Sequence, residues 1–422
     1  MTQGFKLKTN QFRFYKIDMN RHEVRQMNGL KKHINNRFFL GLICSLLVLA
    51  QAPFIAACPF CSAPSLTLTE QLSQADVAVL VQWTEAEKGT LEKAGKTVFE
   101  VKELVKQFDK NKLKVGDKIT INRHRTGKKG NLFLLLGTKG TSVDWGDPIE
   151  VTETSYHYIS QAPAPEEKTS KRLRYFLKFL EYPDQMVSND AYAEFANAPY
   201  EDITPLAKEM PREKIRKWIV DPNTPVTRLG LYGLLLGLCG QESDVAFMEK
   251  KINEPTKEFR LGIDGVISGY LLLTGAEGLD EIDKTKFIPK NVAFSETYAA
   301  MQALRFMWTY GDERISKERL RQSMQLLLDR PELTDLVVAD LARWNDWSVL
   351  DRLMGMYGTG DYDIPSIKRA IVRYLLVASK GKNKKGVGPD PATTEKAKEL
   401  LDKLRKEDPK TVKSAERFFF FK

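Results

Sequence analysis

The chain has 422 residues, of which 42% are hydrophobic and 28% are charged, a composition typical of a soluble globular protein with two or three domains. Its net charge of +10 is uneven, because residues 1–40 carry nine basic and two acidic side chains and leave only +3 for the rest. We therefore expect a surface of mixed charge, which excludes a strongly basic nucleic-acid-binding face.

An uncharged apolar run, Phe38–Ala50, follows this basic prefix, and small residues stand at positions 56 and 57. A basic segment, an apolar run and small residues in this order predict a secretory signal over residues 1–57 and an exported protein of the periplasm or cell envelope. Met27 is an alternative start. The stretch Phe38–Ala57 just reaches the roughly 20 residues of a membrane span, so retention by an N-terminal transmembrane segment is an alternative.

Two cysteines, Cys58 and Cys61, stand in the sequence CPFC at the start of the expected mature chain. The preceding residues, IAA, make a sequence that resembles a bacterial lipobox, in which Cys58 would be acylated. Otherwise we expect a disulfide between the two cysteines in an oxidising compartment. A redox centre is less favoured, because no strand–helix pattern surrounds the pair. A metal centre would need two further ligands from His124, His157 and the distant Cys239, so no metal or cofactor is predicted.

Residues 66–160 read as β-structure, and the expected OB-like β domain spans residues 58–160. Short runs with alternating apolar residues are separated by glycine-containing turns, a pattern typical of a small barrel or sandwich. The expected strands are Asp76–Trp83, Thr97–Val105, Lys118–Arg123, Leu132–Gly137 and Pro148–Thr152. About ninety residues with strands at this spacing fit an OB-like β-barrel.

The pattern changes to a helical period after a proline-containing linker at residues 161–168. Apolar helices in residues 169–380 end near Gly240, Gly275, Gly311, Asn345 and Gly381, at spacings of 35, 36, 34 and 36 residues. Most are followed by an amphipathic stretch, and this period is typical of a HEAT-like α-solenoid. The predicted fold class is thus α+β with several domains, a small OB-like β-barrel followed by a HEAT-like α-solenoid.

Two segments follow the expected solenoid. Residues 381–391 form a basic linker rich in glycine and proline. Residues 392–422 comprise a last helix, Ala392–Glu407, and a tail with four phenylalanines at Phe418–Phe421. We expect the tail either to dock on the last repeat or to bind a partner.

The amphipathic second helices are expected to line an extended binding face. They are Ser243–Ile252, Ile315–Leu328 and Ser348–Tyr357. Lys317, Arg319 and Arg321 are the candidate partner-binding residues. Reversing their charges is expected to weaken partner capture without unfolding the protein, because exposed charges contribute little to stability.

No catalytic constellation is recognisable in the chain, which lacks the HExxH, GxSxG and Walker motifs. Cys239 lies in an apolar helix and reads as a buried structural thiol. Asp363 is expected to cap the helix that Pro365 opens, and Trp344 and Trp347 are expected to pack in a turn between helices. We therefore name no catalytic residue.

Residues 58–160 also resemble the netrin-like domain of tissue inhibitors of metalloproteinases, because a small β-barrel follows an N-terminal cysteine. In that family the first cysteine chelates a protease zinc, so the resemblance implies this role for Cys58, although the family spacing is C-x-C and this chain has C-x-x-C. From CPFCSAPSLTLTEQLSQAD onward the chain is similar to uncharacterised secreted proteins of planctomycete-type bacteria, a likeness that implies no activity.

Together these features predict a non-enzymatic scaffold that holds a protein partner in the cell envelope. Membrane contact is expected only through the signal segment or an acylated Cys58. A thiol-dependent or metal-dependent function centred on Cys58 and Cys61 is one alternative, and inhibitor-like binding through the mature N-terminus is another. A scaffold would keep its partner after loss of both cysteines, whereas the alternatives would not.

Overall fold

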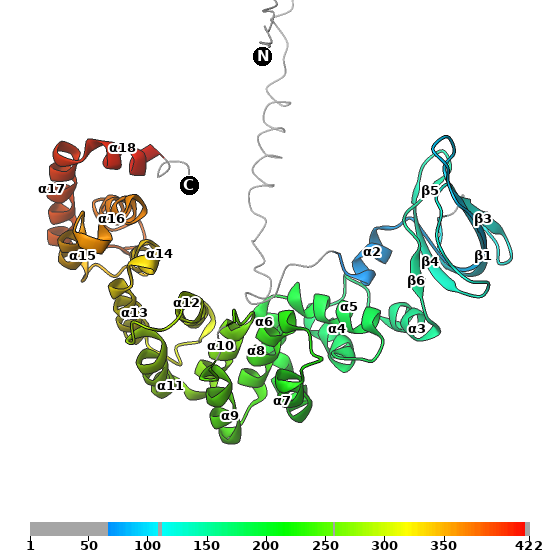
Figure 1. Cartoon of the computed structure of the whole chain (residues 1–422), viewed down its shortest axis with the longest axis horizontal. Coiled ribbons are helices and arrows are strands. Elements are labelled where there is room, and N and C mark those ends of the chain that lie inside the picture. Colours follow the sequence, from blue (N-terminus) through cyan, green and yellow to red (C-terminus); the bar gives the residue numbers. More distant parts are fainter. Residues whose placement is uncertain (1–65, 109–111, 256–257, 418–422) are drawn as a thin grey trace, which may run out of the picture. The chain divides into compact units, whose positions relative to one another are not determined.

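The computed structural model describes residues 66–108, 112–255 and 258–417, and all of them belong to one compact unit. They form a small antiparallel sheet followed by a long run of helices (Figure 1), which confirms the predicted α+β class. No helix within these ranges is long and apolar enough to cross a membrane. The signal segment, Cys58, Cys61 and Phe418–Phe421 lie outside the described residues, so what was predicted for them stays a prediction.

The sheet contains six strands in the order β3-β2-β1-β4-β5, with β6 paired to β4, and every pairing is antiparallel. The strands are β1 (Val77–Glu87), β2 (Lys96–Lys106), β3 (Lys118–Ile121), β4 (Leu132–Lys139), β5 (Val143–Trp145) and β6 (Ile149–Val151). Each expected strand overlaps one of these, and β5 was not expected. The two ends of the strand order, β3 and β5, do not pair with each other, so the sheet is open.

The two faces of the sheet bury different partners. Side chains alternate along a strand, and Val77, Val79 and Val81 of β1 point into an apolar core that the sheet makes with its own strands. Leu80 of β1 and Leu134 of β4 point the other way and join the core of the helical part. One face of the sheet is therefore fastened to the helices.

Two helices lie within the segment that was expected to be β-structure alone, α2 (Leu68–Gln74) and α3 (Glu153–Gln161). Thr67 caps the start of α2 and Thr152 caps the start of α3, each accepting a hydrogen bond from a backbone N–H three residues on. Glu70 completes a capping box in α2. The prediction of β-structure for residues 66–160 is thus wrong near both ends, because these caps and tertiary contacts stabilise helices too short to show a clear period.

The helix α3 connects the sheet to the first helix after the predicted linker, α4 (Thr169–Phe176). The rings of Tyr158 and Tyr175 stack with centroids 5.7 Å apart, and the Tyr175 hydroxyl donates to the backbone oxygen of Tyr158 at 2.7 Å. Ile159 and Leu173 are buried in the same core. The sheet and the first helices therefore share one hydrophobic core across residues 161–168.

The helical part continues to the last described residue. Its further helices are α5 (Gln185–Ala196), α6 (Tyr200–Ile203), α7 (Arg212–Val220), α8 (Leu229–Cys239), α9 (Glu242–Ile252), α10 (Ile263–Thr274), α11 (Ala276–Ile282), α12 (Phe294–Tyr310), α13 (Lys317–Leu326), α14 (Pro331–Arg343), α15 (Leu350–Met356), α16 (Pro365–Ala378), α17 (Pro391–Glu407) and α18 (Pro409–Arg417). The apolar helices pack on their neighbours, α8 on α10, α10 on α12 and α14 on α16.

The helix ends confirm the expected positions of the turns. Gly240, Gly275 and Gly311 are the C-cap residues of α8, α10 and α12. Asn345 after α14 has φ +55° and Gly381 after α16 has φ +67°, in the left-handed region where helices commonly end.

Five glycines bring α8 and α10 into backbone contact, and we call them the glycine seam. They are Gly230, Gly233, Gly237, Gly265 and Gly269. A Cβ atom at Gly233 would lie 2.5 Å from the Cα of Val266, and a Cβ at Gly237 would lie 2.5 Å from the backbone oxygen of Gly269. No side chain fits at these distances, so the seam leaves no space between the two helices.

Candidate functional site

Arg319, one of the three predicted partner-binding cations, is occupied within the protein. Its Nη2 atom lies 2.6 Å from carboxylate oxygens of both Asp280 of α11 and Asp283, the first residue of a π-helical turn. Its Nη1 atom donates to Ser323 at 2.6 Å. Arg319 therefore fastens α13 to α11, so it is not the exposed charge on which the expectation of reversal without unfolding was based.

Lys317 and Arg321 also contact neighbouring helices. The Nε atom of Arg321 donates to the backbone oxygen of Trp344 at 3.1 Å. The ammonium of Lys317 lies 4.5 Å from the ring centre of Trp308 and donates to its backbone oxygen. Since the rings of Trp308 and Trp344 stack with centroids 4.3 Å apart, the two cations border one aromatic contact between helices. None of the three predicted residues is a free charge on an open face.

The candidate metal ligands that the structure describes, His124, His157 and Cys239, do not gather into a site. No group of three or more His, Cys, Asp or Glu residues that could hold a metal ion occurs in the part of the chain that the structure describes. Cys239 is half-buried, and burial raises the pKa of its thiol to about 11. The thiol is therefore protonated near neutral pH, as expected of a structural cysteine.

Two predictions about turns had opposite outcomes. Trp344 and Trp347 pack in a turn as expected, Trp344 on Trp308 and Trp347 with its ring centre 5.2 Å from that of Tyr374. Asp363 does not cap α16, whose N-cap residue is Ile364. The carboxylate of Asp363 lies 3.5 Å from the ammonium of Lys368 instead, so a cation on the helix competes with the backbone for it.

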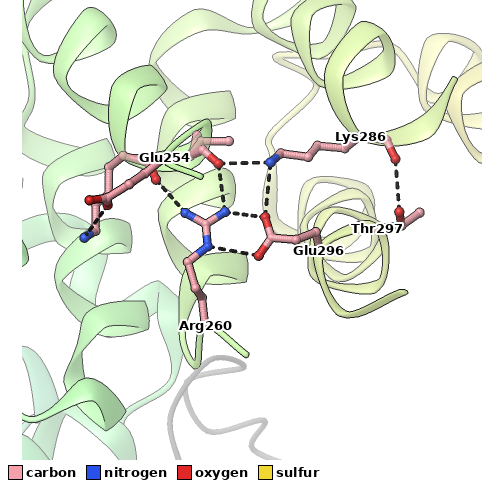
Figure 2. A network of polar contacts seen from close by, with 7 residues as sticks. Glu254, Arg260, Lys286, Glu296 and Thr297 are labelled. Carbon is pink, nitrogen blue, oxygen red and sulfur yellow. Dashed lines mark hydrogen bonds and ion pairs between the residues drawn. The ribbon is translucent and has the colours of Figure 1, made fainter. Parts of the chain in front are cut away.

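A buried polar network joins the loop after α9 to α12 (Figure 2). Glu296 lies 2.9 Å from Arg260 Nε and 3.1 Å from Lys286 Nζ. Arg260 also donates to the backbone oxygen of Ile252 at 2.8 Å, and Lys286 donates to the same oxygen at 3.0 Å. The backbone oxygen of Lys286 accepts from Thr297 at 3.1 Å.

These charges offset one another within the network. Burial acts to raise the pKa of Glu296, but the hydrogen bonds and charges of Arg260 and Lys286 outweigh it and hold the pKa below its ordinary value. Because the two cations and Glu296 are committed to each other and to backbone oxygens, the network reads as a structural tie and not as a binding site.

A groove of about 770 Å³ lies between α14 and α16. On α14 it is lined by Asp335, Leu336, Ala339, Ala342 and Arg343, and on α16 and just beyond by Ser366, Arg369, Ala370, Arg373, Tyr374, Val377 and Lys380. These positions recur every three or four residues, so each helix presents one face to the groove. The alanines leave space at positions where longer side chains would fill it.

The arginines Arg369 and Arg373 set this groove apart from the surfaces that carry the other arginines of residues 66–108, 112–255 and 258–416. Neither makes a hydrogen bond, an ion pair or a ring contact with any other described residue. Within the described ranges, every other arginine before Arg417 has at least one such partner. The groove thus offers two guanidinium groups for an external partner.

The other polar groups of the groove differ from this pair. Arg343 is exposed but lies 2.9 Å from Asp340, which also accepts from Arg305 at 2.7 Å. The hydroxyl of Tyr374 donates to the backbone oxygen of Asp346 at 2.6 Å, so it is directed into the protein. The groove therefore combines an apolar floor with a basic rim, an arrangement suited to binding an anionic apolar ligand.

A second polar cluster holds the N-terminal helix α2 in place. Asp190 of α5 accepts from the backbone N–H of Leu68 and from the Tyr158 hydroxyl, both at 2.7 Å. Burial raises the pKa of Asp190 to about 6, although both hydrogen bonds act to lower it. Beside it, Glu194 accepts from Thr69 at 2.5 Å. We call these contacts the α2 joint.

Neither the groove nor the α2 joint was predicted from the sequence. The groove depends on which faces of two helices a repeat apart remain uncovered, and no local pattern reports that. The available signal was the pair Arg369 and Arg373, spaced one turn apart on a mainly apolar helix. No family model, curated protein or solved structure matches the chain, so the groove is judged by its own geometry.

Proposed function

We propose that this chain is an exported, non-enzymatic scaffold of the cell envelope and that the groove between α14 and α16 holds its protein partner. The observation that carries the proposal is a pair of guanidinium groups, Arg369 and Arg373, that have no polar partner among the described residues and lie beside an apolar floor. The basic prefix and apolar run within residues 1–57 support export.

The proposal also includes two finer fold assignments, a HEAT-like helical part and an OB-like β domain. A HEAT-like reading of the helical part is supported by the period of 34 to 36 residues and by the packing of α8, α10 and α12 on one another. An OB-like reading of the β domain is supported by its antiparallel strands and by the apolar core that they enclose on one face, although the sheet is open. We also propose that the chain is related to the uncharacterised secreted proteins of planctomycete-type bacteria that it resembles.

The proposed binding surface differs from the face of second helices that the sequence suggested. Lys317, Arg319 and Arg321 of α13 already contact neighbouring helices. A partner would have to displace those contacts, whereas Arg369 and Arg373 need no displacement. The groove is therefore the better placed surface.

Site-specific photocrosslinking in the native host tests the proposal. A photoreactive amino acid replaces Leu336, which lines the groove and is 36% exposed, and in a control it replaces Val226, which is 67% exposed and lies outside the groove. We expect one protein to crosslink at position 336, not at 226, and to be lost when Arg369→Glu and Arg373→Glu are combined. Equal capture at both positions, or capture that survives the double reversal, contradicts the proposal.

The alternatives centred on Cys58 and Cys61 are separated by one further variant. In the scaffold proposal, Cys58→Ser with Cys61→Ser leaves the crosslink at position 336 unchanged, provided that equal amounts of protein reach the envelope. A thiol-dependent, metal-dependent or inhibitor-like function predicts that the partner is lost with the cysteines. Immunoblotting of the envelope fraction supplies the control for the amount of protein.

A further inference from the structure

We propose that the partner segment held in the groove is an acidic amphipathic helix, with carboxylates one turn apart that pair with Arg369 and Arg373 and with apolar side chains on the groove floor. The inference rests on the proposed function and names the chemistry of the partner. It depends on three features of the groove, namely the spacing of its free charges, its apolar floor and its single acid.

The spacing of the charges comes first. Arg369 and Arg373 are four residues apart on α16, so they lie one above the other on the same helix face. Like charges at this spacing repel each other and destabilise a helix. Two carboxylates one turn apart on a partner helix would match the two guanidinium groups and would remove the repulsion.

The floor of the groove defines the other half of the partner. Leu336, Ala339 and Ala342 follow one another at intervals of three residues along α14, and Val377 faces them from α16. Leu336 is a large apolar side chain exposed at this surface. A helix that lays its apolar face between two helices buries such residues, which is the usual way in which amphipathic helices bind grooves.

The same features count against a polyanion or a membrane. Asp335 lines the groove and would repel a dense row of phosphates. Nucleic acids and polyphosphates have no apolar face for the floor, and a flat bilayer surface would meet only the rim of a concave groove. Acidic residues combined with apolar ones satisfy both the rim and the floor.

The test uses the full-length protein and three labelled model helices of about 18 residues, or five turns. The first peptide has Leu on one face and Glu on the other, the second has Lys in place of Glu, and the third has Ser in place of Leu. Fluorescence anisotropy measures their dissociation constants. We expect the Leu/Glu peptide to bind about tenfold more tightly than either comparison peptide, with an affinity that falls as salt is raised.

Protein variants then locate the binding. Arg369→Gln with Arg373→Gln should weaken the Leu/Glu peptide about tenfold. The matched control, Lys382→Gln with Lys384→Gln, removes the same charge from exposed residues outside the groove and should change affinity by less than about twofold. Ala339→Trp fills the floor, keeps every charge and should also weaken binding. Unfolding curves check that each variant is folded. If one of the two groove variants does not fold, the other still tests whether the peptide binds in the groove.

Several results would overturn the inference. They are an equal loss of affinity in the lysine control, equal binding of the Lys peptide, and displacement of the Leu/Glu peptide by inorganic polyphosphate or phosphatidylglycerol vesicles at matched charge. Binding only after deletion of residues 418–422 would make the phenylalanine tail the occupant. If the crosslink at Leu336 persists while the Leu/Glu peptide fails to bind, the acidic-helix inference falls and the scaffold proposal stands. If the Leu/Glu peptide binds but no protein crosslinks at Leu336, the scaffold proposal falls.

Discussion

The glycine seam and the groove are two solutions to the same packing problem. In both, apolar helices one repeat apart lie side by side, α8 with α10 and α14 with α16. At the seam, glycines let the backbones touch and exclude any ligand. At the groove, alanines and two arginines without a polar partner in the described part of the chain line a hollow of about 770 Å³. One repeat architecture thus provides either a rigid joint or an open surface, depending on the side chains at a few facing positions.

The glycine seam and the groove should differ most in how much a newly introduced large side chain lowers the free energy of unfolding. Gly237→Leu places atoms where the backbone of Gly269 already lies, and we expect the free energy of unfolding to fall by about 3 kcal/mol. Ala339→Leu points into open space and should change it by less than about 0.5 kcal/mol. Urea unfolding of the two variants measures both values. Similar losses would show that the groove is packed in solution.

The α2 joint, unlike the glycine seam, buries a titratable carboxyl group, so the stability that it contributes should depend on pH. Burial raises the pKa of Asp190 from its ordinary value of 3.8 to about 6 in the folded protein. Its protonated form is therefore favoured by folding, and this stabilisation is complete below about pH 4 and is lost as pH rises through about 6.

The variant Asp190→Asn keeps a side-chain oxygen that can accept hydrogen bonds but removes the titration. Relative to wild type, its free energy of unfolding should gain roughly 1–3 kcal/mol between pH 4 and pH 7.5. Urea unfolding across that range, with Asp335→Asn in the groove as the control, supplies the measurement. An equal pH dependence of the difference for both variants would contradict the burial of Asp190.

An arginine that forms ion pairs between helices should contribute more to the free energy of unfolding than an arginine of the groove. Arg319→Ala removes two ion pairs at 2.6 Å and leaves Asp283, which is buried, without its cation. We expect a loss of about 1.5 kcal/mol in the free energy of unfolding. Arg373→Ala removes no hydrogen bond or ion pair to any described residue and should be neutral within about 0.5 kcal/mol. If both variants lose the same stability, Arg373 has a partner that its position in the groove does not reveal.

The smallest effect should come from the groove charges themselves. Replacing Arg369 by Gln removes a like-charged neighbour of Arg373 and should raise the free energy of unfolding by about 0.3 kcal/mol. The gain should shrink in high salt, since the repulsion is between partly exposed charges. Thermal unfolding at low and high salt measures it. A clear loss of stability would place Arg369 among the structural ties.

Much of the fold could be predicted from local patterns. Strand alternation located five of the six strands, and the spacing of turn residues located the ends of α8, α10, α12, α14 and α16. The Trp344 and Trp347 turn was also predicted correctly. These features depend on neighbours in sequence, through side-chain alternation, helical period and the left-handed conformations that end helices. Even α2 had a readable signal in its capping box at Thr67 and Glu70.

The site depended on contacts between distant residues. In the sequence, Arg319 and Arg373 are equivalent, as each is an arginine on an amphipathic helix. Tertiary structure separates them, because Asp280 and Asp283 form ion pairs with Arg319 and no acid within the described ranges forms one with Arg373. The sequence by itself determined the strands, the repeat period and the helix ends. Which cations are ties, which helices touch and where a groove stays open were decided by packing, since the energy of a charge depends on the groups that surround it in space.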